Sequence, residues 1–435
     1  MGCLHVAILC DDVGDHSEAL RSLDMCIIMG GPLLRPNLDA VVQWIIASWT
    51  VTNESKGRNS DRMVPEEHSK GLDLAKNTMI IASGHKDFFC QSFPTLGAPH
   101  ISVSVVSEAQ ELPPVAKGLS YTFYKTSCPQ VENIIRKHLK GEFKKDIGLA
   151  AGLLRVHFHD CFVQGCDGSV LLDGSASGPG EKDAPPNLTL RPSAFKAINN
   201  LKALIDKQCG RVVSCADITA LAARDSIVLS GGPDYRVPLG RRDGLEFATR
   251  EATNDGLPSP ASNVTILLKV LSKLNLDATD LVALSGGHTI GLGHCSSFSN
   301  RLFPSQDTTM DNTFANNLYK TCPTGTTNKT TVLDIRSPNV FDNKYYADLE
   351  HKQGLFTSDQ DLYIDKRTKE IVTSFSTNQA LFFQKFVASM VKMGQLNVLT
   401  GNKGEIRSDC SKKNSKEGLW PIIVDGEEGQ DFLAF

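Results

Sequence analysis

The segment 153–161, with the sequence LLRVHFHDC, is the densest group of chemically useful side chains in the chain. On a helix, Arg155 and His159 are four residues apart and lie on one face beside Phe158, whereas His157 points away. This face would present a fixed positive charge, an aromatic wall and an imidazole able to exchange a proton near neutral pH. An isolated pair at this spacing is more often a surface cation and a hydrogen-bonded core histidine, so it needs support from elsewhere in the sequence.

The same region raises the question of a metal site. The zinc candidates are His157, His159, Cys161 and Cys166. Zinc is disfavoured because histidines two residues apart diverge on a helix and no C-x-x-C pair accompanies them. The oxygen ligands that calcium would need are offered by Asp160, Asp167 and Ser169 around Gly165. Phe162 occupies an EF-hand ligand position, so this is not an EF-hand loop.

Twelve cysteines are many for a protein of a reducing compartment. Eight follow residue 118: Cys128, Cys161, Cys166, Cys209, Cys215, Cys295, Cys322 and Cys410. An even set of eight is typical of an oxidised framework, but eight cysteines allow 105 pairings and the sequence does not choose among them. The count favours secretion. The sequons at Asn53, Asn187, Asn263 and Asn328 are compatible with secretion.

Composition limits the class of partner. The chain has 45 Lys and Arg against 49 Asp and Glu, so it carries no overall positive field that would attract nucleic acid or an acidic membrane. Its most apolar N-terminal stretch, 41–51, contains polar residues and is too short to cross about 30 Å of hydrocarbon. We therefore expect neither nucleic acid nor a membrane as partner.

Amphipathic helices separated by Gly and Pro turns must position these groups. From Leu119 onward, apolar residues recur at helical spacing in 131–139, 215–227 and 375–393. The apolar run 281–284 stops at a Gly-Gly pair just before His288. Few runs predict strands, so we expect a mostly α architecture with little β-structure.

Several longer motifs then occur in one order. They are RVHFHDCFVQGCDGS at 155–169, EKD at 181–183, VPLGRRD at 237–243 and LSGGHT at 284–289. Together they strongly resemble the secreted class III plant haem peroxidases, and the resemblance runs from about Leu119 to Cys410. It implies the plant haem peroxidase fold, in which two helical halves sandwich one haem b, with two Ca²⁺ ions and four disulfides.

The resemblance also implies a role for individual residues. His288 would be the axial ligand of the haem iron, with Asp359 accepting its second N–H. On the opposite face of the haem, Arg155 and His159 would act on hydrogen peroxide, with Phe158 beside them. Asn187 would accept from His159 Nδ1, with Glu181 behind it, and a glycan on Asn187 would conflict with this buried role. Pro258 resembles the substrate-contact proline of the family.

Two calcium sites and four disulfides follow by the same resemblance. The first calcium would be bound by Asp160, Val163, Gly165, Asp167 and Ser169, with Val163 and Gly165 using their backbone carbonyls. The second would be bound by Thr289, Asp334, Ser337, Val340 and Asp342, where Ser337 replaces the commoner threonine. The implied pairs are Cys128–Cys209, Cys161–Cys166, Cys215–Cys410 and Cys295–Cys322.

The expected activity is reduction of hydrogen peroxide, with phenolic donors oxidised in two one-electron steps by a secreted monomer. The peroxidase domain would span 119–410. Residues 1–118 form an atypical extension, in which 108–118 resembles the end of a signal peptide and the mature start, and 411–435 form an atypical tail; a gene-model artefact would explain both.

Two rival readings and one departure stay open from the sequence. A non-catalytic haem- and calcium-binding wall protein would have lost Arg155, His159 or Asn187, yet all three are present. The unusual N-terminus could instead keep the chain reduced and misfolded. The departure is Tyr235, which stands at a family tryptophan position and leaves no tryptophan between Leu119 and Cys410. Radical chemistry on a proximal tryptophan is therefore disfavoured.

Overall fold

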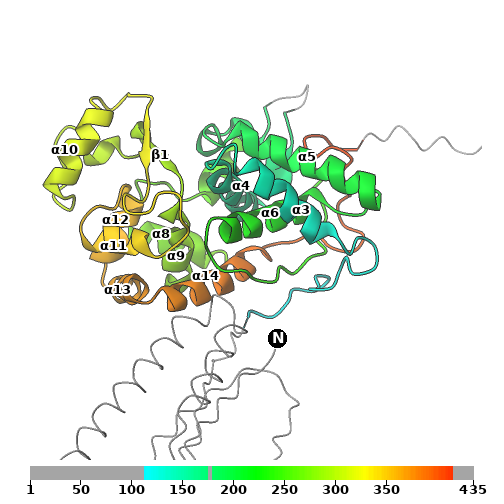
Figure 1. The fold of residues 1–435 in the computed structure, drawn as a ribbon. Coiled ribbons are helices and arrows are strands. Elements are labelled where there is room, and N and C mark those ends of the chain that lie inside the picture. Colours follow the sequence, from blue (N-terminus) through cyan, green and yellow to red (C-terminus); the bar gives the residue numbers. More distant parts are fainter. Residues whose placement is uncertain (1–111, 175–178, 415–435) are drawn as a thin grey trace, which may run out of the picture. The chain divides into compact units, whose positions relative to one another are not determined.

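The computed structural model describes residues 112–174 and 179–414, which belong to one compact unit. Within these residues the regular structure consists of twelve α-helices, several short 3₁₀ turns and one two-stranded sheet (Figure 1). The helices are α3 (Val131–Glu142), α4 (Leu149–Val163), α5 (Pro192–Cys209), α6 (Cys215–Leu229), α7 (Arg250–Gly256), α8 (Val264–Ser272), α9 (Ala278–Ser285), α10 (Asn312–Thr321), α11 (Lys344–Glu350), α12 (Thr357–Ile364), α13 (Lys369–Thr377) and α14 (Gln379–Met393). The strands β1 (Leu292–His294) and β2 (Thr330–Val332) pair antiparallel, with Gly293 opposite Thr331. The prediction of a mostly helical protein with little β-structure is confirmed.

Short polar side chains start several of these helices. The side chains of Ser214, Asn263 and Asp311 each accept a hydrogen bond from a backbone N–H in the first turn of α6, α8 and α10. Asp277 does the same for α9, and Asp280 of α9 accepts in return from the Asp277 backbone N–H. Each bond satisfies an N–H that the helix itself leaves without a partner, so the helix starts are fixed locally by sequence.

The helices form two packed groups on either side of the unit (Figure 1). One group contains α3, α4, α5 and α6; the other contains α8, α9, α11, α12, α13 and α14. One hydrophobic core extends through both, and α4 also contacts α14. Since α4 lies in the middle of its group, it is buried on almost every side, and its buried residues include the polar His157, His159 and Asp160 as well as the apolar ones.

The periodic stretch 375–393 is not one helix. Helix α13 ends at Thr377 and α14 begins at Gln379, because Asn378 adopts an extended backbone conformation and its side chain accepts from the backbone N–H of Leu381. The break leaves the apolar periodicity almost undisturbed, so the pattern of hydrophobic residues did not reveal it.

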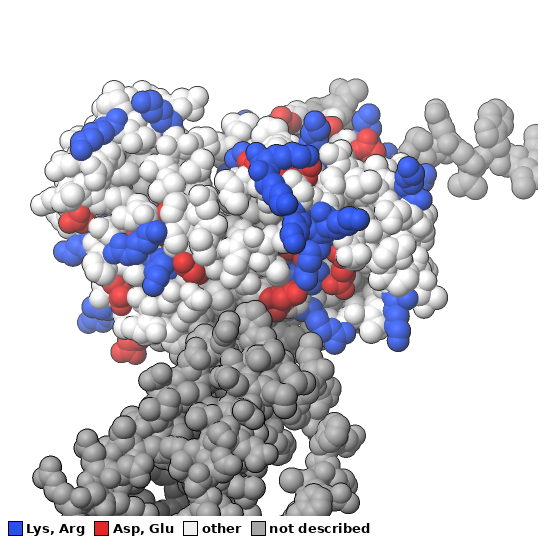
Figure 2. All heavy atoms as spheres, in the orientation of Figure 1, with Lys and Arg blue, Asp and Glu red and all other residues white. Residues whose placement is uncertain are grey.

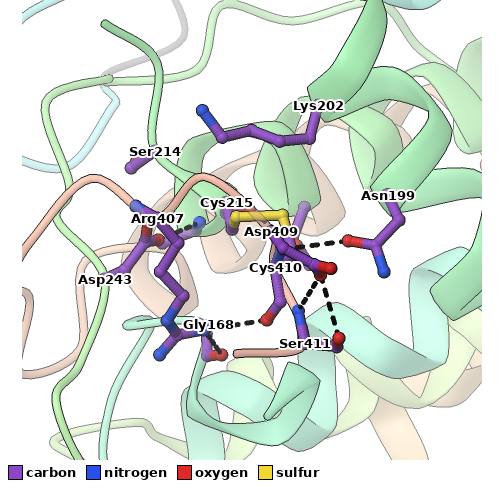
Figure 3. The surroundings of a disulfide bond; sticks show 12 residues. Gly168, Asn199, Lys202, Ser214, Cys215, Asp243, Arg407, Asp409, Cys410 and Ser411 are labelled. Carbon is purple, nitrogen blue, oxygen red and sulfur yellow. Dashed lines mark hydrogen bonds between the residues drawn. A yellow bond between two sulfur atoms is a disulfide. The ribbon is translucent and has the colours of Figure 1, made fainter. Parts of the chain in front are cut away.

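Four disulfides connect distant parts of this unit, and they join the pairs that the resemblance implied: Cys128–Cys209, Cys161–Cys166, Cys215–Cys410 and Cys295–Cys322. Figure 3 shows Cys215–Cys410, which ties the start of α6 to the C-terminal loop. There the backbone N–H of Cys410 donates to Asn199 Oδ1, at 3.0 Å. The buried Arg407 donates to the backbone oxygens of Gly168 and Cys410, and so fixes the loop against the segment after α4.

Residues just before Leu119 belong to the same unit. Gln395 accepts from the Ala116 backbone N–H and donates to the Pro114 carbonyl. Most of the predicted extension 1–118, the sequon at Asn53 and the tail from 415 onward lie outside the described residues. No helix in the described part of the chain is long and apolar enough to cross a membrane. On the face drawn in Figure 2, Lys and Arg side chains stand among Asp and Glu side chains.

Candidate functional site

The first candidate histidine, His159, lies on α4 and is bound at both ring nitrogens. Arg155 lies one turn earlier, and its Nε donates to His159 Nε2 at 3.1 Å. His159 Nδ1 lies 2.6 Å from Asn187 Oδ1. Since a guanidinium can only donate, Nε2 is the acceptor, and the ring proton is on Nδ1, which donates to Asn187. The predicted pairing of Arg155 and His159 on one helix face is present in the structure.

Asn187 is itself held in this orientation. It is 3% exposed, and its Nδ2 donates to the backbone carbonyl of Glu181 at 2.9 Å, which leaves Oδ1 facing His159. The Glu181 carboxylate points elsewhere: its Oε2 accepts from the Ala248 backbone N–H. Glu181 thus stands behind Asn187 through its backbone rather than through its acid group. Both polar atoms of the Asn187 side chain are used, so the folded site has no room for a glycan on this sequon.

Burial controls the charge of the groups around His159. Burial and the neighbouring Arg155 charge lower the pKa of His159 to about 3, so the imidazole is neutral and able to accept a proton at pH 7. Burial also lowers the pKa of Arg155 to about 10, which leaves it charged at pH 7. Phe158 meets the His159 ring edge-on at 5.0 Å between ring centroids. The result is a neutral base and a fixed cation side by side.

The Arg155 side chain is fixed by the segment that carries Asn187. Its two terminal nitrogens donate to the backbone carbonyls of Pro186 and Thr189 at 3.0 Å, and one also donates to Thr189 Oγ1. Neither Pro186 nor Thr189 belongs to a sequence motif that predicted the site. Only their closeness to Asn187 in sequence could have drawn attention to them, because backbone acceptors leave no residue-type signal.

The second candidate histidine, His288, follows α9 in a 3₁₀ turn, and Asp359 lies in the first turn of α12. His288 Nδ1 lies 2.7 Å from Asp359 Oδ1. Asp359 is 2% exposed; although burial alone would raise its pKa, His288 and hydrogen bonds from Phe356 N and the Tyr345 hydroxyl hold that pKa below its usual value. The carboxylate is therefore ionised and accepts from His288 Nδ1, leaving Nε2 as the free nitrogen. Tyr345 was not predicted, since it lies 57 residues from His288 in sequence.

The first set of predicted calcium ligands includes two neighbouring carboxylates, those of Asp160 and Asp167. Asp160 Oδ2 accepts from the Gly168 N–H and Asp167 Oδ1 from the Ser169 N–H, both at 2.9 Å. Burial and the nearby Asp167 charge both raise the pKa of Asp160, which lies well above its usual value. Asp160 Oδ1 is buried without a hydrogen-bond partner. Two desolvated carboxylates with a free oxygen suit a divalent cation. The turn needs Gly165, whose φ is +123° and whose missing Cβ would collide with Asn397 and the Leu396 carbonyl.

The second set converges on the hydroxyl of Thr289, the residue after His288. Thr289 Oγ1 lies 3.1 Å from Asp334 Oδ2, 3.3 Å from the Val340 carbonyl and 3.4 Å from Asp342 Oδ1. Ser337 Oγ lies 2.9 Å from Asp342 Oδ1, so serine reaches the cluster as the commoner threonine would. Five oxygen donors from one loop and one turn suit Ca²⁺, which prefers such ligands.

The residues considered for zinc and disfavoured from the sequence have other roles in the structure. Cys161 and Cys166 are joined to each other, so neither is a zinc ligand. His157 is buried against Cys161, and burial together with the Arg241 charge lowers its pKa to about 3. Within the described ranges, no group of three or more His, Cys, Asp and Glu side chains could hold a metal ion. Each of the two oxygen clusters contains only two carboxylates, and its other predicted ligands are hydroxyl or carbonyl oxygens.

Pro258 lies between α7 and α8 and is partly exposed. None of the described contacts links it to His159 or His288. The sequon residues Asn263 and Asn328 are exposed, unlike Asn187.

Comparison with known proteins gives the family. A family model described as peroxidase matches residues 135–378, and a second, described as KDM8-like, N-terminal ARM repeats, matches residues 1–60, outside the described range. Peroxidase 12 of Arabidopsis thaliana is 64% identical over 315 residues, covering 72% of this chain and 88% of the relative. Cationic peroxidase SPC4 of Sorghum bicolor is 62% identical over 326 residues, covering 74% and 90%. Peroxidase 42 of Zea mays is 46% identical over 297 residues, covering 68% and 90%.

The family-model match includes both histidines and most of both helix groups, and the relatives are aligned over most of their own length. Since fold, motif order and identity agree, this chain is an enzyme of the class III plant peroxidase family, which uses haem to reduce hydrogen peroxide at the expense of a reducing donor.

Proposed function

We propose that this peroxidase cleaves hydrogen peroxide with His159 and Arg155 and that His288 holds the iron of one haem b. The observation that carries the proposal is the matched orientation of two histidines. In each, Nδ1 is bonded to a buried side-chain oxygen, so Nε2 is the nitrogen that carries the lone pair. His159 Nε2 accepts from Arg155 Nε at 3.1 Å, and it would exchange that hydrogen bond for the proton of the peroxide.

The residues around His288 fit a haem iron. Nδ1 is occupied by Asp359, and 37% of the imidazole side chain is exposed, so Nε2 can reach a ligand. The ionised Asp359 draws on the Nδ1 proton and makes the imidazole a stronger electron donor. When bound there, haem supplies the redox chemistry of the reaction.

His159 and Arg155 would divide the work on peroxide. Neutral His159 accepts a proton from the near oxygen of hydrogen peroxide and returns it to the departing oxygen, which leaves as water. General acid–base transfer of this kind is worth about 10² to 10⁴ in rate. Arg155 stabilises the negative charge that builds as the O–O bond breaks, a contribution of about 3 to 4 kcal/mol. Asn187 keeps the ring proton on Nδ1, so Nε2 stays available as the base.

The electrons come from small phenols. Hydrogen peroxide gains two electrons and two protons to give two waters, and two phenol molecules each lose one electron and one proton. We propose Pro258 as a contact residue for these donors, on the basis of its position in the sequence LPSP at 257–260.

The two oxygen clusters would hold one Ca²⁺ each. The first follows His159 directly through Asp160, and the second follows His288 directly through Thr289. Because each cluster fixes the backbone next to a histidine, bound calcium would hold both imidazoles in position. We further propose that the protein is a secreted monomer with the domain bounds 119–410, consistent with four disulfides between distant helices.

The decisive experiment uses the full chain expressed through an oxidising pathway with haem and calcium. We expect a Soret band, hydrogen peroxide consumption and two molecules of guaiacol oxidised per peroxide. His288→Ala should abolish the Soret band, whereas His159→Ala should keep it and lose the reaction with peroxide. A wild-type protein that is folded and oxidised but takes up no haem would overturn the proposal.

A further inference from the structure

Asp359 receives more hydrogen bonds than the orientation of His288 requires. Its Oδ2 accepts from the Phe356 backbone N–H at 2.9 Å. Its Oδ1 accepts from two donors at once, His288 Nδ1 at 2.7 Å and the Tyr345 hydroxyl at 2.9 Å. The two donors therefore share one carboxylate oxygen.

Tyr345 is placed firmly enough to keep this bond. It is 1% exposed and lies in the first turn of α11. Asn343, at the N-terminus of this helix, donates to the carbonyls of Phe375 and Ser376 and so anchors the helix start to α13. The Tyr345 ring meets His288 edge-on, at 6.0 Å between ring centroids.

Sharing an oxygen weakens the acceptor. Each hydrogen bond that a carboxylate receives stabilises its charged form and makes it less basic. A less basic Asp359 pulls less strongly on the Nδ1 proton of His288, so the imidazole keeps more of its neutral character. The electron donation that His288 can offer through Nε2 is then reduced.

We propose that Tyr345 is a positioning residue for the peroxidase reaction, because its hydroxyl shares Asp359 Oδ1 with His288 and thereby limits the electron donation of that histidine. The inference rests on the proposed role of His288 as the iron ligand. Tyr345 touches neither iron nor substrate; it acts through Asp359.

The neighbouring residue supplies a matched control. Tyr346 is also buried in α11, and its ring lies 5.1 Å from that of Tyr345. Its hydroxyl donates to the backbone carbonyl of Val282 at 2.9 Å instead of to Asp359. Tyr346→Phe therefore removes the same atom from the same helix without touching the carboxylate.

The test compares the haem-loaded, full-length wild type with Tyr345→Phe and Tyr346→Phe. The measurements are the midpoint potential of the ferric–ferrous couple and the iron–histidine stretching frequency of the ferrous form. Tyr345→Phe should shift the potential to more negative values and raise the stretching frequency, since a stronger histidine donor favours the ferric state. Tyr346→Phe should match the wild type in both.

A double-mutant comparison separates tuning from general packing. In an Asp359→Ala background, Tyr345→Phe should change neither measurement, because the shared acceptor through which it acts is gone. An unshifted Tyr345→Phe, an equal shift in Tyr346→Phe, or a shift that persists in the Asp359→Ala background would each overturn the inference. Loss of haem in Tyr345→Phe alone would also do so, since the hydroxyl would then serve assembly. A wild type without a Soret band would instead sink the proposed function itself.

Discussion

The two helix groups each hold one histidine by Nδ1, and they differ in the group that accepts that hydrogen bond. His159 donates to a neutral amide, Asn187, whereas His288 lies against an ionised carboxylate, Asp359. An amide orients the ring and leaves the Nε2 lone pair weakly basic. A carboxylate also draws on the ring proton and makes Nε2 a stronger donor. The amide partner thus suits the proton transfer proposed for His159, and the carboxylate partner suits the metal ligation proposed for His288.

The largest expected effect comes from removing His159, the proposed base. His159→Ala should leave haem bound and slow the reaction with hydrogen peroxide by about 10² to 10⁴, because no other neutral base stands beside Arg155 among the described residues. Stopped-flow absorbance after mixing with peroxide measures this rate. A rate close to that of the wild type would remove the role assigned to His159.

Exchanging the acceptors tests the comparison directly. Asn187→Asp would give His159 a carboxylate partner, raise its pKa and protonate part of the base at pH 7. We expect a reaction with peroxide about 10- to 100-fold slower, with the Soret band retained.

The matched change is Asp359→Asn, which gives His288 an amide partner. It should raise the midpoint potential of the ferric–ferrous couple while leaving the pH profile of the peroxide reaction in place. If Asn187→Asp moved the potential and Asp359→Asn moved the pH profile, the two roles would be assigned to the wrong histidines.

Calcium removal should have a smaller effect. The oxygen clusters adjoin both histidines without touching the reacting atoms, so chelation should loosen the two rings and lower turnover by about tenfold. The loss should be reversed by Ca²⁺. Ser337→Ala should weaken calcium binding only at the second cluster and should shift the haem spectrum through His288. Asp160→Asn should lower the measured calcium content, and an unchanged content would contradict the proposed first site.

The smallest effect is expected from pH between about 4 and 9. The pKa of His159 is lowered to about 3 and that of Arg155 to about 10, so both keep their working charge state across this range. The peroxide reaction should slow about tenfold per pH unit below the His159 pKa and again above the Arg155 pKa. In Asn187→Asp the acidic limb should move to higher pH, and an unmoved limb would show that another group titrates.

The depressed histidine pKa also has a consequence for stability. Since the folded pKa of His157 and His159 lies below the usual 6.5, the unfolded chain binds more protons at mildly acidic pH. The free energy of unfolding is therefore highest, as far as these two histidines are concerned, above about pH 6.5, and it decreases as pH falls toward about 3.

Local sequence determined much of this protein. Helix periodicity and short polar caps fixed the helices, and the four-residue spacing of Arg155 and His159 placed them together on α4. Local sequence also supplied eight cysteines, the motif order and the residue types of both oxygen clusters. These features depend on neighbours within one or two turns, which is the range over which residue patterns are informative.

Only the tertiary structure decided which groups meet. It turned the backbone of Glu181 rather than its acid toward Asn187, and it brought the hydroxyl of Tyr345 to Asp359. Such contacts depend on how helices pack across tens of residues and on backbone atoms that every residue shares, so no residue pattern in the chain records them.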